Sequence, residues 1–106
     1  MKVYLKSAKR AIDATAEYDT ETRTCIVLKG SIVSACVSEA ATFRGAKTVE
    51  KYREKFVKDQ VVIEDVSFKS PSTAANFVTG SSTDGTRAWK TGEGITISAL
   101  PKKDEG

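Results

Sequence analysis

Four lysines recur at nearly helical spacing in the middle of the chain, and together they could neutralise a row of phosphates. They are Lys47, Lys51, Lys55 and Lys58. At about 100° per residue their side chains fall on one side of a helix, and Arg44 joins them if the helix starts early. Between Arg44 and Lys58 the chain carries six basic and two acidic residues, a local charge of +4, whereas the rest carries −1.

This basic helix face has two interpretations. A face that touched four phosphates would give a slope of log affinity against log salt of about −3.6 on duplex DNA. The alternative is a solvated face on which Glu54 and Lys58 attract each other across one helical turn. The sequence leaves both interpretations open.

A serine-rich helix start is the second candidate binding feature. Ser70 is a favoured N-cap residue, and Pro71 fits the first helical position. The N–H groups of this start could meet a phosphate together with nearby hydroxyls and an amine. These groups belong to Ser70, Ser72, Thr73 and Lys69. We favour the simpler interpretation, in which Ser70 only caps the helix, although both hold if the helix end is exposed.

The polar stretch "SSTDGTR" that follows is longer than a minimal turn between a helix and a strand requires. Its candidate contacts are Ser81, Ser82 and Arg87, and Arg87 could reach a phosphate or a guanine edge. The nearby Trp89 could stack on a base. A lone tryptophan in a small domain is more often a core anchor whose indole N–H finds one partner, and we favour that interpretation.

Catalytic and metal-binding residues are scarce in this sequence. There is no histidine, which removes the commonest general base and a common zinc ligand. Asp59, Glu64 and Asp65 are the carboxylates that a magnesium-dependent nuclease would use. Glu64 and Asp65, however, are adjacent on an expected strand and would point to opposite faces. We therefore predict a non-catalytic domain with no metal and no cofactor.

The two cysteines and the apolar runs indicate the expected compartment. Cys25 and Cys36 lie in apolar surroundings and do not form a Cys-x-x-Cys pair, so we predict two buried, reduced thiols. The longest aliphatic run, residues 25–28, is far shorter than a membrane span, and the first ten residues lack the core of a signal peptide. The prediction is a cytoplasmic domain that does not contact a membrane.

Alternating apolar and polar residues predict strands in the first third of the chain, over residues 3–5 and 12–18. The polar stretch 19–24 predicts a turn. The continuous apolar run 25–28 predicts a strand covered on both faces. Residues 31–39 fit either a further strand or an irregular extension.

Helical periodicity appears over residues 46–59, where Val49, Tyr52 and Phe56 form an apolar stripe with the stem of Arg53 along its margin. Residues 61–66 predict a strand. A second helix is predicted from Pro71 to the left-handed residue Gly80. Residues 87–90 and 95–98 predict a hairpin joined by "TGEG".

These elements predict an α+β fold: a mainly antiparallel sheet with two helices packed on it and a C-terminal β-hairpin. The length of 106 residues suits one domain, which we place at residues 1–100. The charged tail at residues 101–106 is expected to be frayed.

The second half of the chain resembles a bacterial domain family of unknown function that follows GIY-YIG nuclease domains or stands alone in restriction-modification settings. The residues that carry the resemblance are Phe68, Ser70-Pro71-Ser72, Ala74-Ala75, Val78, Gly80, Asp84-Gly85, Trp89 and Gly94, with Val27 to Ser31 as an upstream strand. The restriction-enzyme adenine-methylase-associated (RAMA) module has a similar serine-proline helix and tryptophan turn. In this chain Asp84 stands where asparagine is common, and Thr86 where a bulkier residue often follows.

The resemblance implies a non-catalytic accessory domain that binds DNA, and it supplies no catalytic residues. The lysine stripe, the helix start at Ser70 to Ser72 and the loop at Ser81 to Arg87 would form the contact surface. The alternative is a protein-interaction module that docks on a nuclease or methyltransferase subunit through an apolar patch around Trp89. A shared surface requires the lysine stripe and the loop to lie on one face.

Overall fold

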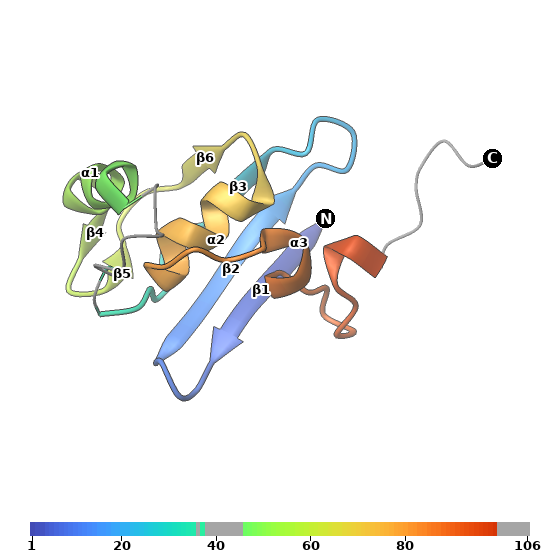
Figure 1. Cartoon of the computed structure of the whole chain (residues 1–106), viewed down its shortest axis with the longest axis horizontal. Helices are drawn as coiled ribbons and strands as arrows, with labels where there is room; N and C mark the ends of the chain where they lie inside the picture. Colours follow the sequence, from blue (N-terminus) through green and yellow to red (C-terminus); the bar gives the residue numbers. More distant parts are fainter. Residues whose placement is uncertain (36, 38–45, 100–106) are drawn as a thin grey trace.

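A computed structural model of the chain describes residues 1–35, 37 and 46–99. In this part of the chain, four strands form an antiparallel sheet in the order β1-β2-β3-β6, with a two-stranded unit β4-β5 beside it (Figure 1). The strands are β1 (Lys2–Ser7), β2 (Ile12–Tyr18), β3 (Cys25–Val27), β4 (Val57–Lys58), β5 (Val61–Val62) and β6 (Val66–Phe68). The helices are α1 (Ala46–Phe56), α2 (Pro71–Thr79), α3 (Gly85–Ala88) and the short 3-10 helix η1 (Ile97–Ala99).

The first hairpin follows the alternation in the sequence. Strands β1 and β2 pair in antiparallel register from Lys2 opposite Glu17 to Ser7 opposite Ile12. The predicted apolar face of β2 is buried, from Ile12 to Tyr18 at every second residue. The strand predictions for this region and the turn at 19–24 are confirmed.

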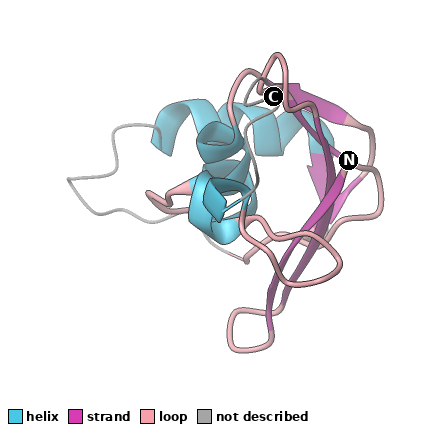
Figure 2. Cartoon of the chain, turned by 90° about the vertical axis from the view of Figure 1, so that its right-hand side faces the viewer, coloured by secondary structure: helices cyan, strands magenta, loops and turns pink. Residues whose placement is uncertain are grey.

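The core lies between one face of the sheet and the helices, which gather to one side of the strands (Figure 2). Helix α2 is its centre, with Ala74, Phe77 and Val78 fully buried. Both predicted caps are present: the Ser70 side chain accepts a hydrogen bond from the Thr73 N–H, and Gly80 adopts a left-handed φ of 71°. Helix α2 is therefore defined by local signals at both ends.

The opposite face of the sheet has no helix on it in the described residues (Figure 2). Ile26 and Leu28, which point to that face, are only half-buried. The expectation that the strand at 25–28 is covered on both faces is therefore wrong. Its two covered residues, Cys25 and Val27, face the core.

Helix α1 ends at Phe56, three residues earlier than predicted. The chain then forms a tight hairpin in which Val57 pairs with Val62 and Lys58 with Val61. Asp59 and Gln60, the two turn residues, have φ of 52° and 68°. A two-residue turn in which both residues have positive φ matches the twist of a β-hairpin. Val57 and Lys58 are the first strand of this hairpin, so the helix must end before them.

The single strand predicted at 61–66 is two strands, β5 and β6, with Ile63 to Asp65 between them. Asp65 accepts a hydrogen bond from the Lys29 N–H at 2.8 Å. Glu64 and Asp65 therefore lie in a break rather than on a strand, and the argument from opposite strand faces does not apply. The burial of Val62, Val66 and Phe68 on one side is as predicted.

The C-terminal hairpin is not formed. Arg87 lies in α3, and Ile97 begins η1. Only an isolated bridge joins Lys90 to Thr96 in this region, and Lys90 also bridges to Tyr4 at the edge of the sheet. The α+β class is confirmed, but the described two-stranded hairpin is the central β4-β5.

Residues 31–33 form an irregular extension rather than a strand, with Ile32 bridging to both Asp13 and Val61. Several sequence predictions fall outside the described residues: those for Cys36, for Arg44, for residues 38 and 39 and for the tail at 101–106. No helix in the described ranges is long and apolar enough to span a membrane.

Burial should make the Cys25 thiol unreactive. Cys25 is fully buried, and desolvation raises its pKa from 9.0 to about 12. In a Cys36→Ser background, we expect Cys25 to react with an alkylating reagent at pH 8 at least about 100-fold more slowly in the native than in the unfolded chain. Alkylation followed by mass spectrometry measures this, and equal rates would contradict it.

The same pKa predicts how stability depends on pH. Between pH 9 and pH 12 the unfolded chain loses the thiol proton and the native chain keeps it. The contribution of Cys25 to the free energy of unfolding therefore falls as pH rises, by about 1.4 kcal/mol per pH unit.

Candidate nucleic-acid interface

Three of the four lysines in the predicted stripe lie on α1. Lys47, Lys51 and Lys55 are exposed and share one side of the helix, because they are four residues apart. Lys55 Nζ lies 5.4 Å from the centroid of the Phe56 ring. None of the described lysines forms an ion pair. Lys58 is also exposed, but it belongs to β4.

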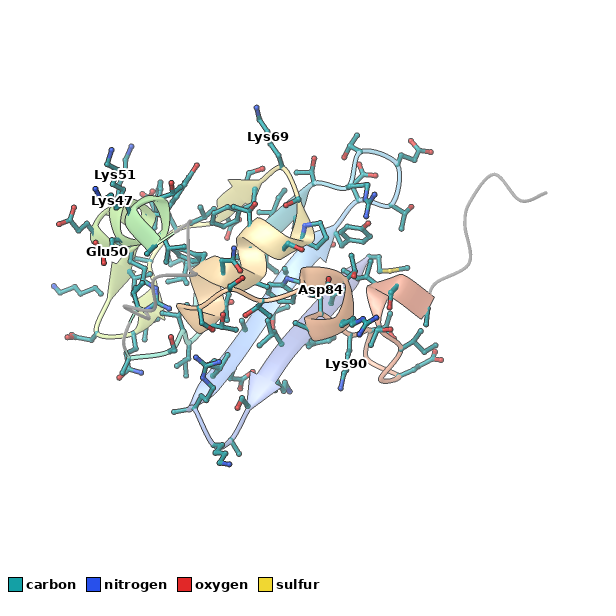
Figure 3. All side chains as sticks on the ribbon, in the orientation of Figure 1. Lys47, Glu50, Lys51, Lys69, Asp84 and Lys90 are labelled. Atoms are coloured by element: carbon teal, nitrogen blue, oxygen red, sulfur yellow. The ribbon has the colours of Figure 1, made fainter. Side chains whose placement is uncertain are left out.

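Lys69, between β6 and α2, extends the positive surface of α1. It is exposed, and it projects from the same edge of the molecule as Lys47 and Lys51 (Figure 3). We name Lys47, Lys51, Lys55 and Lys69 the lysine edge. This set differs from the predicted stripe in two ways. It includes Lys69, which sequence spacing did not group with the helix, and it leaves out Lys58, which belongs to β4.

Arg53, on the other side of α1, is partly buried and bonded mainly to backbone. Its guanidinium donates hydrogen bonds to the carbonyl oxygens of Ser34, Phe77 and Val78 and to Ser34 Oγ, at 2.7–3.1 Å. Phe77 and Val78 lie in the last turn of α2, where carbonyl groups lack helical partners. Sequence spacing placed Arg53 at the margin of an apolar stripe and missed this role.

The helix start at Ser70 is occupied by contacts within the chain. Ser70 Oγ accepts from the Thr73 N–H at 3.2 Å and lies 3.0 Å from Thr73 Oγ1. Ser72 Oγ accepts from the Gly85 N–H at 3.0 Å. Of these hydroxyl residues, Thr73 is exposed, while Ser70 and Ser72 are partly buried. The capping interpretation of Ser70 is confirmed.

Gly85 packs directly on the first peptide of α2. A Cβ atom built at Gly85 would lie 2.1 Å from the carbonyl carbon and oxygen of Pro71 and 2.4 Å from the Ser72 nitrogen. No side chain fits at that distance. The start of α3 therefore packs against the Ser72 nitrogen at the start of α2, and the next N–H, that of Thr73, is already bonded to Ser70 Oγ.

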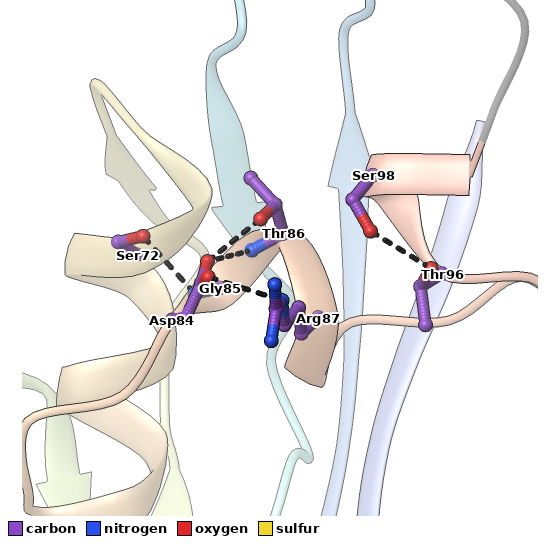
Figure 4. Close-up of polar contacts among 7 residues, drawn as sticks. All are labelled: Ser72, Asp84, Gly85, Thr86, Arg87, Thr96 and Ser98. Atoms are coloured by element: carbon purple, nitrogen blue, oxygen red, sulfur yellow. Dashed lines mark hydrogen bonds and ion pairs between the residues drawn. The ribbon is translucent and has the colours of Figure 1, made fainter.

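Asp84 caps α3 (Figure 4). Its Oδ1 accepts from Thr86 Oγ1 at 2.7 Å and from the Thr86 N–H at 3.0 Å. The hydrogen bond from the Thr86 hydroxyl lowers the pKa of the Asp84 carboxyl, and the nearby Arg87 adds to the effect. Arg87 Nε lies 3.7 Å from Asp84 Oδ2, and both side chains are exposed. The positive charge of Arg87 is thus balanced within the loop.

The rest of the loop is bonded to α2 and its flanks. The Thr83 N–H donates to Asn76 Oδ1 at 2.8 Å, and Thr83 Oγ1 lies 2.8 Å from Thr79 Oγ1. Ser81 is partly buried, with its N–H donating to Thr79 Oγ1, whereas Ser82 is exposed. The length of "SSTDGTR" therefore has a structural explanation that sequence spacing did not reveal.

Trp89 is a core residue. Its side chain is fully buried, and its indole N–H donates to the Pro71 carbonyl oxygen at 3.0 Å. The preferred interpretation of Trp89 is confirmed, and its ring cannot stack on a base or form a docking patch. Pro71, Gly85 and Trp89 together hold α3 against the start of α2.

The structure brings the predicted helix start and loop into contact, at Ser72 and Gly85, but separates the loop from the lysine stripe. Lys47 and Lys51 lie at one end of the molecule, while Asp84 lies in the middle of the helical face (Figure 3). The charges also differ: the α1 lysines are unpaired, whereas the loop from Ser81 to Arg87 carries one acidic and one basic side chain. The lysine edge is the stronger candidate interface.

Other kinds of site find no support in the described ranges. No cluster of three or more histidine, cysteine, aspartate or glutamate side chains could hold a metal ion there. Two surface hollows of about 470 and 430 Å³ lie beside Tyr18 and beside Arg53. None of the predicted contact residues lines either hollow.

Comparison with known proteins identifies the chain only at the level of its family. No curated protein and no solved structure shows significant similarity to it. The model of the family described as "Domain of unknown function (DUF4357)" matches residues 3–101. Because this match spans nearly the whole sequence, the chain belongs to the DUF4357 family.

Proposed function

We propose that this chain is a non-catalytic DNA-binding accessory domain, and that the lysine edge is its contact surface. The observation that carries the proposal is the concentration of unpaired positive charge on one side of α1. Lys47, Lys51 and Lys55 are exposed and make no ion pair, while Arg53 on the other side is bonded to backbone carbonyls. Such a row of amines suits the phosphate backbone and carries no base-specific geometry.

The resemblance to domains that accompany GIY-YIG nucleases, and to the RAMA module, supports a nuclease or restriction-modification setting for this activity. In that setting the domain would hold a separate catalytic unit near DNA. Phosphate contacts position a protein without reading sequence. A preference for adenine methylation would need contacts beyond the lysine edge, and exposed Ser82 and Arg87 are the loop side chains available for them.

Titration of labelled duplex, single-stranded and adenine-methylated DNA tests the proposal. We expect duplex binding with a dissociation constant of about tens of micromolar in low salt, and a salt slope of about −3.6 for four phosphate contacts. Absence of binding to all three DNAs at these protein concentrations would refute it.

A triple variant separates the lysine edge from general positive charge. Lys47→Ala, Lys51→Ala and Lys55→Ala together should weaken binding at least about tenfold and leave a salt slope of about −0.9. The matched control replaces Lys2, Lys6 and Lys9, which are exposed lysines on and after β1, and removes the same charge. Equal losses in both variants would show that only net charge matters.

The alternative proposal is a module that docks on a nuclease or methyltransferase subunit. Trp89 contributes no surface for it because the ring is fully buried. The exposed aliphatic side chains that remain include Ile32, Val61, Ile63 and Ile95. Capture of a partner from the native host that survives nuclease treatment would favour this alternative.

A further inference from the structure

The sheet face without a helix carries an apolar strip that the proposed function does not use. Ile32, Val61 and Ile63 are 38%, 38% and 42% exposed. Ile32 and Val61 are bridged through their backbones, and Ile63 lies two residues beyond Val61. The half-buried Ile26 of β3, and Leu28 just after that strand, point to the same face. A solvated face of an antiparallel sheet is normally polar, and a contiguous apolar strip on it marks an interface.

Backbone pairing places four exposed side chains in one row across this strip. Asp13 is bridged to Ile32, Ile32 to Val61, and Val61 is paired with Lys58. Residues directly opposite each other in a sheet point to the same face. The row therefore reads Asp13, Ile32, Val61, Lys58: an acid at one end, two aliphatic side chains in the centre and an amine at the other end.

Neither charged end of the row is satisfied within the chain. Asp13 and Lys58 form no side-chain hydrogen bond and no ion pair in the described residues. Lys6 lies opposite Asp13 across β1 and β2, but its amine sits 5.6 Å from the centroid of the Tyr4 ring. Both ends are thus available to a second molecule.

We propose that this row is the centre of a homodimer interface. In this dimer a two-fold axis lies in the interface, parallel to the strands, and passes between Ile32 and Val61. Rotation about this axis places the row of the second copy opposite the first in reversed order. Ile32 of one copy then faces Val61 of the other, and Asp13 faces Lys58 twice. Two copies of the sheet would pack as an aligned sandwich about 10 Å apart, the usual arrangement of two antiparallel sheets.

The charge pattern selects a second copy over other occupants. An isologous contact requires a surface that is complementary to itself. A row with opposite charges at equal distances from its apolar centre meets that requirement. The helical layer and the lysine edge stay outside this contact, since Lys58 belongs to β4 and the lysine edge to α1 and the start of α2.

Sedimentation equilibrium of the whole chain, from low micromolar to millimolar concentration, tests the proposal. We expect a reversible dimer with a dissociation constant in the micromolar range, typical of a small interface. Wild-type protein that stays monomeric throughout this range would overturn the proposal. So would a dimer whose stability the row variants do not change.

Charge reversal tests the two-fold arrangement itself. Asp13→Lys or Lys58→Asp alone creates two like-charge contacts per dimer and should weaken association about tenfold. The double variant restores both pairs with reversed sign and should return the dissociation constant to within about threefold of wild type. Glu93→Lys and Lys90→Asp, at exposed positions outside the row and outside the lysine edge, are the matched controls and should leave it unchanged.

A separate substitution tests the apolar centre of the row. Val61→Asp places a carboxylate opposite Ile32 of the second copy and should abolish the dimer at all concentrations tested. Ile95→Asp, at an equally exposed aliphatic position away from the row, is the control. Circular dichroism confirms that both variants are folded. A double charge reversal that associates no better than the single variants would refute the two-fold pairing even if Val61→Asp is monomeric.

Discussion

Replacing Gly85 with alanine should destabilise the fold by about 4 kcal/mol, near the upper limit for a single substitution. The added Cβ would lie 2.1 Å from both carbonyl atoms of Pro71 and 2.4 Å from the Ser72 nitrogen. These are backbone atoms of α2 and cannot rotate away as a flexible side chain would. The start of α3 must therefore move off α2, which breaks the hydrogen bond from the Gly85 N–H to Ser72 Oγ.

Chemical denaturation followed by tryptophan fluorescence measures this effect. Trp89 is the only tryptophan, and its buried indole bonds to Pro71, so its emission also reports whether α3 stays in place. The control is Gly92→Ala, whose Cβ would meet only Tyr4 Cε2 at 3.8 Å, an ordinary contact. We expect a change of less than about 1 kcal/mol for the control. Equal denaturation midpoints for the two variants would contradict the close approach of Gly85 to the Pro71 carbonyl.

The elements that depend on local residues could be predicted from the sequence. Alternation alone gave β2 with the correct buried face, because a strand with one face in the core repeats every two residues. Helix α2 was predicted with both caps, because Ser70 with Pro71 and Gly80 have strong positional preferences. In both cases the signal lies within the element itself.

The C-terminal hairpin could not be rejected from the sequence, because long-range contacts decide the structure there. Asp84-Gly85 fits a loop as well as a helix start, and the residues between it and the predicted "TGEG" turn alternate like a strand. What selects the helix is the packing of Gly85 on Pro71 and the bond from the Trp89 indole to the same residue. These partners are 14 and 18 residues apart in the chain.

The candidate site could be predicted only in part, because long-range contacts also determine where its residues lie. Four-residue spacing correctly placed Lys47, Lys51 and Lys55 on one exposed side of a helix. The prediction that Lys58 belongs to that helix is wrong. The chain turns at Asp59 and Gln60, which both have positive φ, and neither is a glycine, the residue that usually signals such a turn in a sequence. The pairing of strands that puts Lys58 in a row with Asp13 is a property of tertiary structure.

The motif that carries the family resemblance has a structural role in this chain. Pro71, Gly85 and Trp89 contact one another, and Ser72 bonds to the Gly85 N–H. These contacts dock α3 on the start of α2. These residues, which carry the resemblance, therefore maintain the fold, and neither the lysine edge nor the row proposed to bind a second copy is among them.

Arg53 should contribute the second-largest effect among the substitutions considered, about 3 kcal/mol on replacement with methionine. Its guanidinium donates to the Phe77 and Val78 carbonyls in the last turn of α2 and to Ser34. Methionine keeps the length and apolar stem of the side chain but removes this donor from the partly buried Ser34 and Phe77 carbonyls, while the Val78 carbonyl keeps the Ser34 N–H at 2.9 Å. A buried acceptor that loses its donor costs more than the hydrogen bond itself contributes.

The matched control is Arg10→Met. The guanidinium of Arg10 also reaches the end of α2, at the Thr79 carbonyl at 2.9 Å, but Arg10 is exposed and Thr79 has a second donor in Ser34 Oγ. We expect its loss to cost less than about 1 kcal/mol, because water can replace an exposed donor. Arg53→Lys should recover less than half of the loss, since one ammonium group cannot span several carbonyls as a planar guanidinium does. Urea denaturation of the three variants decides the matter: if Arg53→Met and Arg10→Met shift the midpoint equally, Arg53 is not the group that joins α1 to the end of α2.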